Sequence, residues 1–239
     1  MFKISVITTL YNYRNYIAEC IGSFLSQNFK NSEMIIIDDC STDDPYEIIK
    51  KYQKYSEKRV RYIKLPEKAN YSVAKNVGIK NSKSEIIVML DADDMLTLNS
   101  LKIRYDKLKK GYDFVHGPAL DKKEGRPLVR NRLWDLWNEK GGWKHVHAQG
   151  VMLKKDIHRK IGLYDETLQC KSDREFFARV FNHNFKIGTV DSDVALYRRH
   201  SKQMHRSKEK AKINNKLQKE VLKLIKKRKI DLTGLDMLK

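Results

Sequence analysis

The sequence has 239 residues, enough for one large domain or for two smaller halves that share a sheet. Lys and Arg number 49 against 30 Asp and Glu, so the formal net charge is +19 and the expected partner is anionic: nucleotide phosphates, nucleic acid or an acidic membrane surface. No apolar run approaches the roughly 18 residues of a membrane span, and the N-terminus lacks the apolar core of a signal peptide, so we expect a soluble or at most peripheral protein.

The three cysteines, Cys20, Cys40 and Cys170, are widely spaced and odd in number. Such a set is typical of neither a disulfide framework nor a zinc site. We therefore expect a cytoplasmic protein with reduced thiols, in contact at most with the inner face of the membrane.

Strand and helix patterns alternate through the first part of the chain. The expected strands, separated by helical apolar stripes, cover residues 4–7, 34–37, 60–65 and 86–90. We expect the first strand to end before Thr8, which opens a polar loop over residues 8–12. This alternation predicts an α/β fold with a mostly parallel, Rossmann-like sheet, right-handed crossovers and flanking helices.

The apolar run over residues 86–90 ends in three carboxylates, Asp91, Asp93 and Asp94. Together with the polar stretches 8–12 and 38–43, they would share the edge of the sheet where α/β proteins bind ligands. Clustered carboxylates repel one another unless a cation lies among them, and such oxygen ligands suit Mg²⁺ or Mn²⁺. A solvated acidic turn before a helix near Thr97 is the competing interpretation.

Phosphate recognition would need other means than a glycine-rich loop. Neither the dinucleotide fingerprint G-x-G-x-x-G nor the P-loop pattern G-x-x-x-x-G-K-[ST] occurs in the chain. A metal and basic side chains would take that role, and Lys75 in the segment NYSVAKN is a candidate. A solvated lysine on a helix face is the alternative interpretation of Lys75.

Beyond Leu96 the pattern is less regular. We expect helices over 100–108 and from Asp173, and strands over 112–116, within 145–156, over 186–190 and over 194–197. Three grouped tryptophans, which could pack in a core or stack on sugar rings, are Trp134, Trp137 and Trp143. The carboxylate of Asp173 could simply stabilise the amides at the start of its helix.

The last part of the chain is strongly basic. Residues 201–239 hold 13 Lys and Arg against 4 acidic residues, a net charge of 13 − 4 = +9. An apolar stripe runs through Ile213, Leu217, Val221, Leu224 and Ile225. Residues 205–239 therefore form a predicted basic amphipathic helix, which either lies on an anionic membrane or docks on the domain.

Five segments together resemble a known family: SVITTLYN, IIIDDCSTDD, SVAKNVGI, VMLDADDM and SDREFF. Their order and approximate spacing resemble glycosyltransferase family 2, the inverting enzymes of the GT-A fold, over about residues 3–200. The resemblance implies a GT-A domain over residues 1–204, with a nucleotide-binding half at 1–96 and an acceptor half at 97–204, followed by the tail at 205–239.

The resemblance also implies a nucleotide site. Thr8 and Tyr11 would frame the nucleotide base, and Asp39 would accept a hydrogen bond from uracil. Lys75 would lie near the nucleotide, and Asp91 would face the ribose. The expected donor is thus a nucleotide-sugar, with a UDP-sugar favoured.

Three further residues complete the site that the resemblance implies. Asp93 would bind the divalent metal, Mn²⁺ or Mg²⁺, that bridges the diphosphate, and His200 would lie near the diphosphate or the metal. Asp173 would be the catalytic base. The family often has an acidic residue before the base, whereas this chain has Ser172.

The expected activity is transfer of one sugar, or a few, to an acceptor hydroxyl on a saccharide, a lipid-linked or a protein-linked molecule. The chain lacks the membrane spans and the Q-x-x-R-W motif of processive polysaccharide synthases. A nucleotidyltransferase is one alternative, although TTLYNYRN has no glycine-rich loop. A non-catalytic protein that binds an anionic ligand or a membrane surface is another, although the predicted sheet-edge loops are acidic, and we expect no nucleic-acid partner.

Overall fold

The computed structural model describes residues 2–123, 148–168, 172–201 and 203. The regular first part contains β1 Ile4–Leu10, α1 Arg14–Leu25, β2 Ser32–Asp38, α2 Tyr46–Tyr55, β3 Val60–Lys64, α3 Tyr71–Asn81 and β4 Ile86–Asp91. Shorter elements follow: β5 Met95–Leu96, α4 Ser100–Leu108, β6 Phe114–His116, β7 Ala119–Lys123, the 3₁₀-helix η1 Ala148–Gly150, β8 Met152–Lys154, α5 Asp156–Ile161, α6 Ser172–Phe181, β9 Ile187–Thr189 and β10 Ala195–Arg199.

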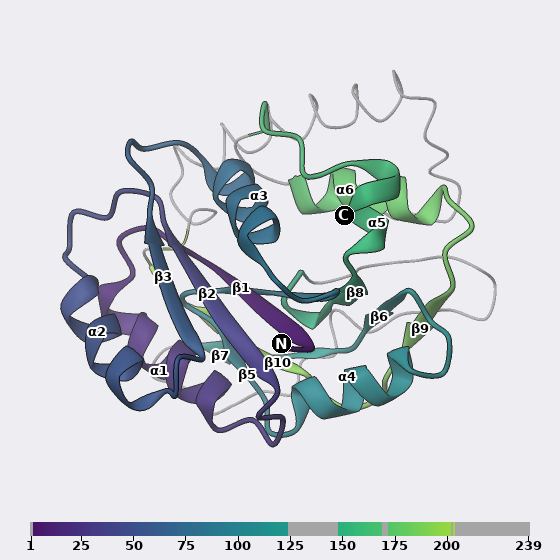
Figure 1. Ribbon diagram of the computed structural model, residues 1–239, viewed down its shortest axis with the longest axis horizontal. Coiled ribbons are helices and arrows are strands. Elements are labelled where there is room, and N and C mark those ends of the chain that lie inside the picture. The colour runs from purple at the N-terminus through teal and green to yellow at the C-terminus, as the bar shows by residue number, and fades with distance from the viewer. Residues whose placement is uncertain (1, 124–147, 169–171, 202, 204–239) are drawn as a thin grey trace.

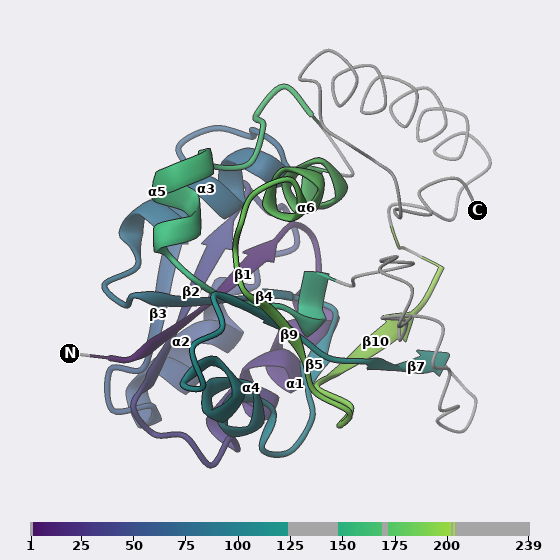
Figure 2. The same cartoon turned by 90° about the vertical axis from the view of Figure 1, so that its right-hand side faces the viewer.

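Two sheets are present in the described residues. The larger has seven strands in the order β3-β2-β1-β4-β8-β6-β9, and the smaller has the order β5-β10-β7. Strands β3, β2, β1 and β4 are parallel, whereas β8 runs antiparallel to both of its neighbours. The predicted α/β class with a mostly parallel sheet is confirmed. Figure 2 shows β10 and β7 beside each other at one side of the molecule.

Helices cover both faces of the large sheet, as Figure 1 shows: α1, α2 and α4 lie on one face, and α3, α5 and α6 on the other. Alternate residues of each buried strand enter the two apolar layers, so that Val6 packs toward α1 and Ile7 toward α3. Helix α3 lies very close to the sheet, because a Cβ atom on Gly78 would be 2.3 Å from Ile7 Cγ2. Any side chain larger than hydrogen at position 78 would therefore push α3 away from the sheet.

The register of β1 aligns the strand ends. Thr9 pairs with Asp91 on one side, and Leu10 pairs with Asp38 on the other. The expectation that β1 ends before Thr8 is wrong, because ladder partners on both sides extend the strand to Leu10. The carboxyl ends of β1, β2 and β4 consequently meet at one edge of the sheet.

Some elements of the second part agree with the predicted ones and others were missed. Helix α4 has the predicted bounds, and α6 begins one residue before Asp173. The predicted elements do not include β5, β7 and α5, each of which has only two to six residues. Elements this short carry too few side chains for a periodic pattern.

Three predictions concern residues outside the described part: the environment of the tryptophans Trp134, Trp137 and Trp143, that of Cys170, and the helix over 205–239. Cys20 and Cys40, which the structure describes, are free thiols. None of the described helices combines the length and the apolar character that crossing a bilayer requires.

Candidate functional site

The loops after β1 and β2 form one connected wall at the edge of the sheet. The backbone N–H of Asn12 donates to Ser41 Oγ at 3.0 Å, and Asn12 Oδ1 accepts from the N–H of Thr42 at 2.8 Å. Asn12 and Cys40 both have positive φ angles, 56° and 58°. Such angles are uncommon in residues other than glycine, although Asn tolerates them, and they concentrate at functional sites.

Asp91, at the end of β4, is the most heavily hydrogen-bonded carboxylate of this edge. Tyr71 OH donates to both of its oxygens, at 2.8 and 3.0 Å. Thr9 Oγ1 donates to Oδ1 at 3.2 Å, and the amide of Gln149 donates to Oδ2. Burial raises the pKa of Asp91 to about 6, although the charge of Lys75 opposes that rise.

Asp93 and Asp94 lie in the turn between β4 and β5, and β10 of the small sheet holds both of them. The backbone N–H of Arg198 donates to Asp94 Oδ1 at 2.8 Å, and the Arg198 guanidinium donates to the carbonyl oxygen of Asp93 at 2.9 Å. His200 Nε2 lies 3.1 Å from Asp93 Oδ2, and the His200 ring stacks on Tyr16 at a centroid distance of 4.4 Å. The structure thus brings His200 to the acidic cluster.

The acidic cluster has the chemistry of a divalent metal site. Ligand oxygens of Asp91, Asp93 and Asp94 lie within 4.8 Å of one another. Burial and the two neighbouring carboxylates raise the pKa of Asp94 well above its usual range, so the cluster is unfavourable as a set of bare anions. Asp94 Oδ2 and His200 Nδ1 are buried and have no hydrogen-bond partner among the described residues. A hard cation such as Mn²⁺ or Mg²⁺ fits this donor set.

Lys75 is not the solvated lysine of the alternative interpretation, because only 1% of it is exposed. Its ammonium group lies over two aromatic rings, 3.8 Å from the centroid of Tyr71 and 4.6 Å from that of Tyr164. No described residue accepts a hydrogen bond from Nζ. Burial lowers the pKa of Lys75, and the carboxylates of Asp173 and Asp91 oppose that shift. Lys75 therefore lies within electrostatic reach of both.

Asp39 and Tyr11 lie in the loops at the far side of the edge. Asp39 is 7% exposed and accepts a hydrogen bond from the backbone N–H of Ala69 at 2.6 Å. Burial raises the pKa of Asp39. Tyr11 is 36% exposed, and Lys68 Nζ lies 2.7 Å from its hydroxyl oxygen. Tyr11 is thus a large aromatic side chain open to a ligand beside a buried carboxylate.

Thr8 lies within β1 and not in the loop that the sequence analysis expected. None of its surface is exposed, and it contacts the buried thiol of Cys20. The threonine hydroxyl that reaches the carboxylates is that of Thr9. The nucleotide contact of Thr8 stays a prediction.

Asp173 is partly exposed in the first turn of α6. Its charge raises the pKa values of Tyr71 and Tyr164, two residues whose pKa burial already raises, so it lies on the side of the site formed by α3 and α6. The structure thereby gathers Asp173, Lys75 and Asp91 around the same two tyrosines.

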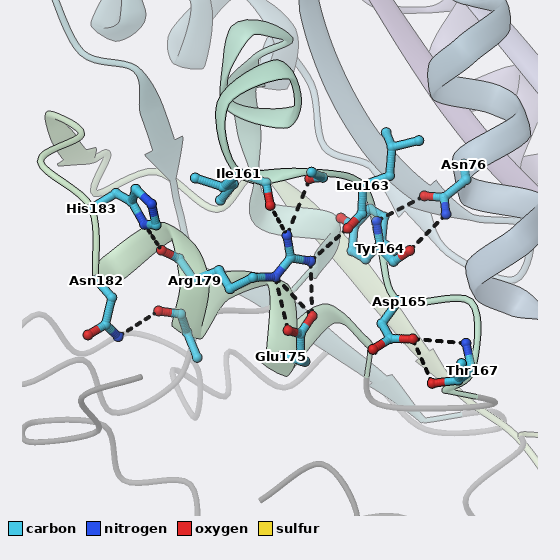
Figure 3. A network of polar contacts seen from close by, with 12 residues as sticks. Asn76, Ile161, Leu163, Tyr164, Asp165, Thr167, Glu175, Arg179, Asn182 and His183 are labelled. Carbon is cyan, nitrogen blue, oxygen red and sulfur yellow. Dashed lines mark hydrogen bonds and ion pairs between the residues drawn. The ribbon is translucent and has the colours of Figure 1, made fainter. Parts of the chain in front are cut away.

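The segment that leads toward Asp173 is fixed by polar contacts from two helices, shown in Figure 3. On the α3 side, Asn76 Nδ2 donates to the carbonyl oxygen of Tyr164 at 2.8 Å and to Glu166 Oε1 at 2.9 Å, and Asn76 Oδ1 accepts from the Tyr164 N–H at 3.0 Å. On the α6 side, Arg179 donates to the carbonyl oxygen of Leu163 at 2.7 Å and pairs with buried Glu175. This double attachment sets α6 relative to α3.

Besides Thr9, three residues that hold the carboxylates were not among the predicted site residues: Tyr71, Gln149 and Arg198. Tyr71 could have been found, because it lies four residues before Lys75 and so shares its helix face. Gln149 and Arg198 reach their partners across 58 and 105 residues of sequence, respectively. No local pattern indicates contacts of that range.

A family model described as Glycosyl transferase family 2 matches residues 5–201. The chain belongs to glycosyl transferase family 2. The match spans both halves of the site, from β1 to His200.

Individual relatives agree with this assignment. The chain is 28% identical over 216 residues to a GalNAc(5)-diNAcBac-PP-undecaprenol beta-1,3-glucosyltransferase of Campylobacter jejuni, and the match covers 87% of this chain and 63% of that protein. The chain spans between 27% and 71% of the length of the first four curated relatives it matches.

Solved structures confirm the GT-A fold. The complex of Staphylococcus aureus TarS residues 1–349 with UDP-GlcNAc matches with a TM-score of 0.72 at 20% identity, covering 92% of this chain and 67% of that one. A mannosyltransferase of Pyrobaculum calidifontis, in complex with GDP-Man and Mn²⁺, matches with a TM-score of 0.66 at 16% identity. The match covers 82% of this chain and 56% of that one.

Proposed function

We propose that this family 2 protein is a metal-dependent inverting glycosyltransferase that moves a sugar from a UDP-sugar to an acceptor hydroxyl. One observation carries the proposal: the three carboxylates at the end of β4 share the sheet edge with Asp39, which follows β2, and buried Lys75 is near both Asp91 and Asp173. A binding protein would not need an additional carboxylate there in the first turn of a separate helix. The proposed acceptor is a saccharide, free or linked to a lipid or a protein.

Asp39, Tyr11 and Asp91 would hold the nucleotide. The partly exposed ring of Tyr11 offers aromatic surface for a base, next to Lys68, whose ammonium group lies 3.9 Å from the ring centroid. Asp39 retains a carboxylate oxygen beyond the bond it accepts from Ala69. Asp91, fixed at the end of β4, would receive the ribose hydroxyls. The UDP-sugar bound by TarS supports uridine as the base.

Asp93, with Asp91, Asp94 and His200 around it, would hold the divalent metal. A bound Mn²⁺ or Mg²⁺ supplies charge stabilisation to the diphosphate that leaves. The Mn²⁺ in the mannosyltransferase complex supports this assignment. The buried and unpartnered Asp94 Oδ2 supports it independently of any relative.

Asp173 would act as general base. An acceptor hydroxyl is a weak nucleophile until its proton is removed, and a positioned carboxylate typically contributes about 10²- to 10⁴-fold in rate. In this step the acceptor oxygen bonds to the anomeric carbon, the bond from that carbon to the diphosphate breaks, and the proton moves to Asp173. Attack from the side opposite the leaving group inverts the anomeric centre.

A lipid-linked acceptor is one form that the proposal includes. The Campylobacter jejuni relative carries an undecaprenol diphosphate acceptor in its name. The predicted basic tail at 205–239 would favour contact with the anionic membrane where such acceptors are found. The donor and acceptor halves, 1–96 and 97–204, would then present the sugar and the acceptor to each other across the edge of the sheet.

A donor screen tests the proposed function without knowledge of the acceptor. UDP- and GDP-sugars would be incubated with the protein and Mn²⁺ or Mg²⁺, and release of the nucleoside diphosphate would be measured. We expect slow, metal-dependent hydrolysis of at least one UDP-sugar, which EDTA abolishes. Absence of both hydrolysis and UDP binding with either metal would reject the proposal.

A further inference from the structure

The carboxylate of Asp91 accepts hydrogen bonds from three protein side chains, Thr9, Tyr71 and Gln149, and the hydroxyl of Tyr71 is shared between its two oxygens. Three donor hydrogens leave capacity for a ligand hydroxyl. Thr9 and Tyr71 belong to the first half of the chain. Gln149, only 4% exposed, belongs to η1 of the second half. Its amide must present nitrogen to Asp91, because two facing oxygens would repel each other.

Gln149 is held in place by a buried arginine. Arg104 on α4 has no exposed surface, and its guanidinium donates to the carbonyl oxygens of Gln149 and Val151 at 3.4 and 3.0 Å. It also donates to Ser100 Oγ at 2.8 Å. All of these acceptors are neutral, and burial lowers the pKa of Arg104 to about 9. Arg104 has no carboxylate partner among the described residues, and a buried charge without one is costly, which argues that this position has a use beyond packing.

The backbone around Gln149 is also fixed from the other side. The carbonyl oxygen of Gly150 accepts a hydrogen bond from the N–H of Gly117 at 3.2 Å. A Cβ atom on Gly150 would lie 2.4 Å from the Gly117 carbonyl oxygen. The 3₁₀-helix therefore cannot shift toward Gly117, and α4 holds it from behind.

We propose that Gln149 is a positioning residue of the donor site, which holds Asp91 in the orientation that receives the ribose, and that Arg104 keeps Gln149 in register. This inference rests on the proposed function, since it takes Asp91 as the ribose-facing carboxylate. Gln149 touches Asp91 and not the reacting atoms, so its effect is on recognition of the nucleotide. Loss of its amide frees Asp91 to turn about its own side-chain bonds.

Comparing the affinities for UDP and for its deoxy forms distinguishes a positioning role of Gln149 from a structural one. If Gln149 orients Asp91, then removing its donor should weaken the contacts of Asp91 with the ribose hydroxyls and leave the diphosphate and base contacts in place. Deoxynucleotides already lack one such contact, so they should lose less affinity than UDP. A general loss of stability would instead weaken all nucleotides by the same factor.

The experiment compares Gln149→Met and Gln149→Glu with Gln27→Met. Gln27 is the matched control, because it is 1% exposed and its amide bonds Ser23, Thr97 and Leu101. Calorimetry with Mn²⁺ would measure the affinities for UDP, 2′-deoxy-UDP and 3′-deoxy-UDP. Melting temperatures would be recorded on the same samples.

We expect Gln149→Met to bind UDP about 5- to 10-fold more weakly, because the contacts of Asp91 with the ribose should weaken by about one ordinary net hydrogen bond. The preference for UDP over the deoxynucleotides should fall toward one. Gln149→Glu, of the same shape, should lose more affinity because it sets a second carboxylate against Asp91. Gln27→Met should melt at a lower temperature and keep the wild-type preference.

An unchanged preference for UDP over the deoxynucleotides in either Gln149 variant overturns the inference. If Gln149→Met does not fold, Gln149→Glu alone provides the test. Equal weakening of all three nucleotides also overturns it, because that result indicates a structural role. If the wild-type protein itself fails to bind UDP with Mn²⁺, the proposed function fails and this inference with it. The wild-type measurement therefore separates the two failures.

Discussion

The two halves of the chain build their parts of the site in different ways. In the first half, the carboxylates follow directly from parallel strands whose ends are aligned by pairing, as Thr9 with Asp91 and Leu10 with Asp38. In the second half, Asp173 depends on a segment attached by side chains, above all by Asn76 of α3. The difference teaches that strand pairing places the backbone of the donor side, whereas the base is placed by a few polar side-chain bonds.

The largest expected effect comes from changing Asp173, because it should separate the two halves functionally. Asp173→Asn removes the proton acceptor and should lower transfer by about 10²- to 10⁴-fold. UDP and Mn²⁺ affinity should stay near wild type, since Asp173 makes none of the proposed nucleotide or metal contacts. Turnover and nucleotide affinity would be measured on one preparation.

Asp156→Asn is the matched control for that variant. Asp156 is also a first-turn carboxylate, on α5, where it pairs with Lys160. The Asp156→Asn protein should transfer sugar at the wild-type rate. An active Asp173→Asn protein would show that another group takes the proton.

A smaller effect is expected from removing the hydrogen bonds by which Asn76 of α3 holds the backbone of Tyr164 in the second half. Asn76→Ala leaves the backbone N–H and carbonyl of Tyr164 without their partner, which should cost roughly 2–3 kcal/mol of stability. Transfer should fall on the order of tenfold to a hundredfold because the segment before α6 shifts, while UDP affinity changes little. Thermal melting measures the loss of stability, turnover measures the loss of transfer, and calorimetry measures the UDP affinity.

The control for this variant lies on the same helix. Asn81 is exposed, and among the described residues its side-chain amide donates only to the helix carbonyl of Val77. Asn81→Ala should leave both stability and transfer nearly unchanged. Equal effects of the two substitutions would mean that Asn76 acts through helix stability alone.

The sequence predicted the first half well and the second half poorly, for a physical reason. Residues 86–91 form a buried strand with an acidic end, and strand periodicity is a local property that a sequence shows directly. Gln149 and Arg198 reach the same carboxylates only because β8 inserts antiparallel beside β4 and β10 pairs with β5. Those pairings depend on packing between segments that are distant in the sequence. The short strands involved have too few residues for a sequence pattern to predict their partners.

The smallest expected effect is the pH dependence of metal stabilisation. Burial raises the pKa of Asp91 to about 6, so between about pH 4 and pH 6 the unfolded chain ionises before the folded one. The metal-free protein therefore loses stability as the pH rises through this window. Mn²⁺ binds the ionised carboxylates and should offset that loss.

Melting temperatures with Mn²⁺ and with EDTA would be compared at pH 5 and pH 7.5. Mn²⁺ should raise the melting temperature by roughly 5 °C at pH 7.5 and by less at pH 5, where protons compete for Asp91. Asp93→Ala should show no shift at either pH. A shift of the same size at both pH values would exclude a role for this titration.

The most direct test of a metal-dependent nucleotide site at the end of β4 is calorimetry of UDP binding with Mn²⁺ and with EDTA. Wild-type protein should bind UDP more tightly with Mn²⁺, and Asp93→Ala should abolish the difference between the two conditions. Asp113→Ala, which removes a carboxylate paired with Lys154 outside the site, should keep that difference. Identical UDP affinity with and without Mn²⁺ in the wild-type protein would contradict the account.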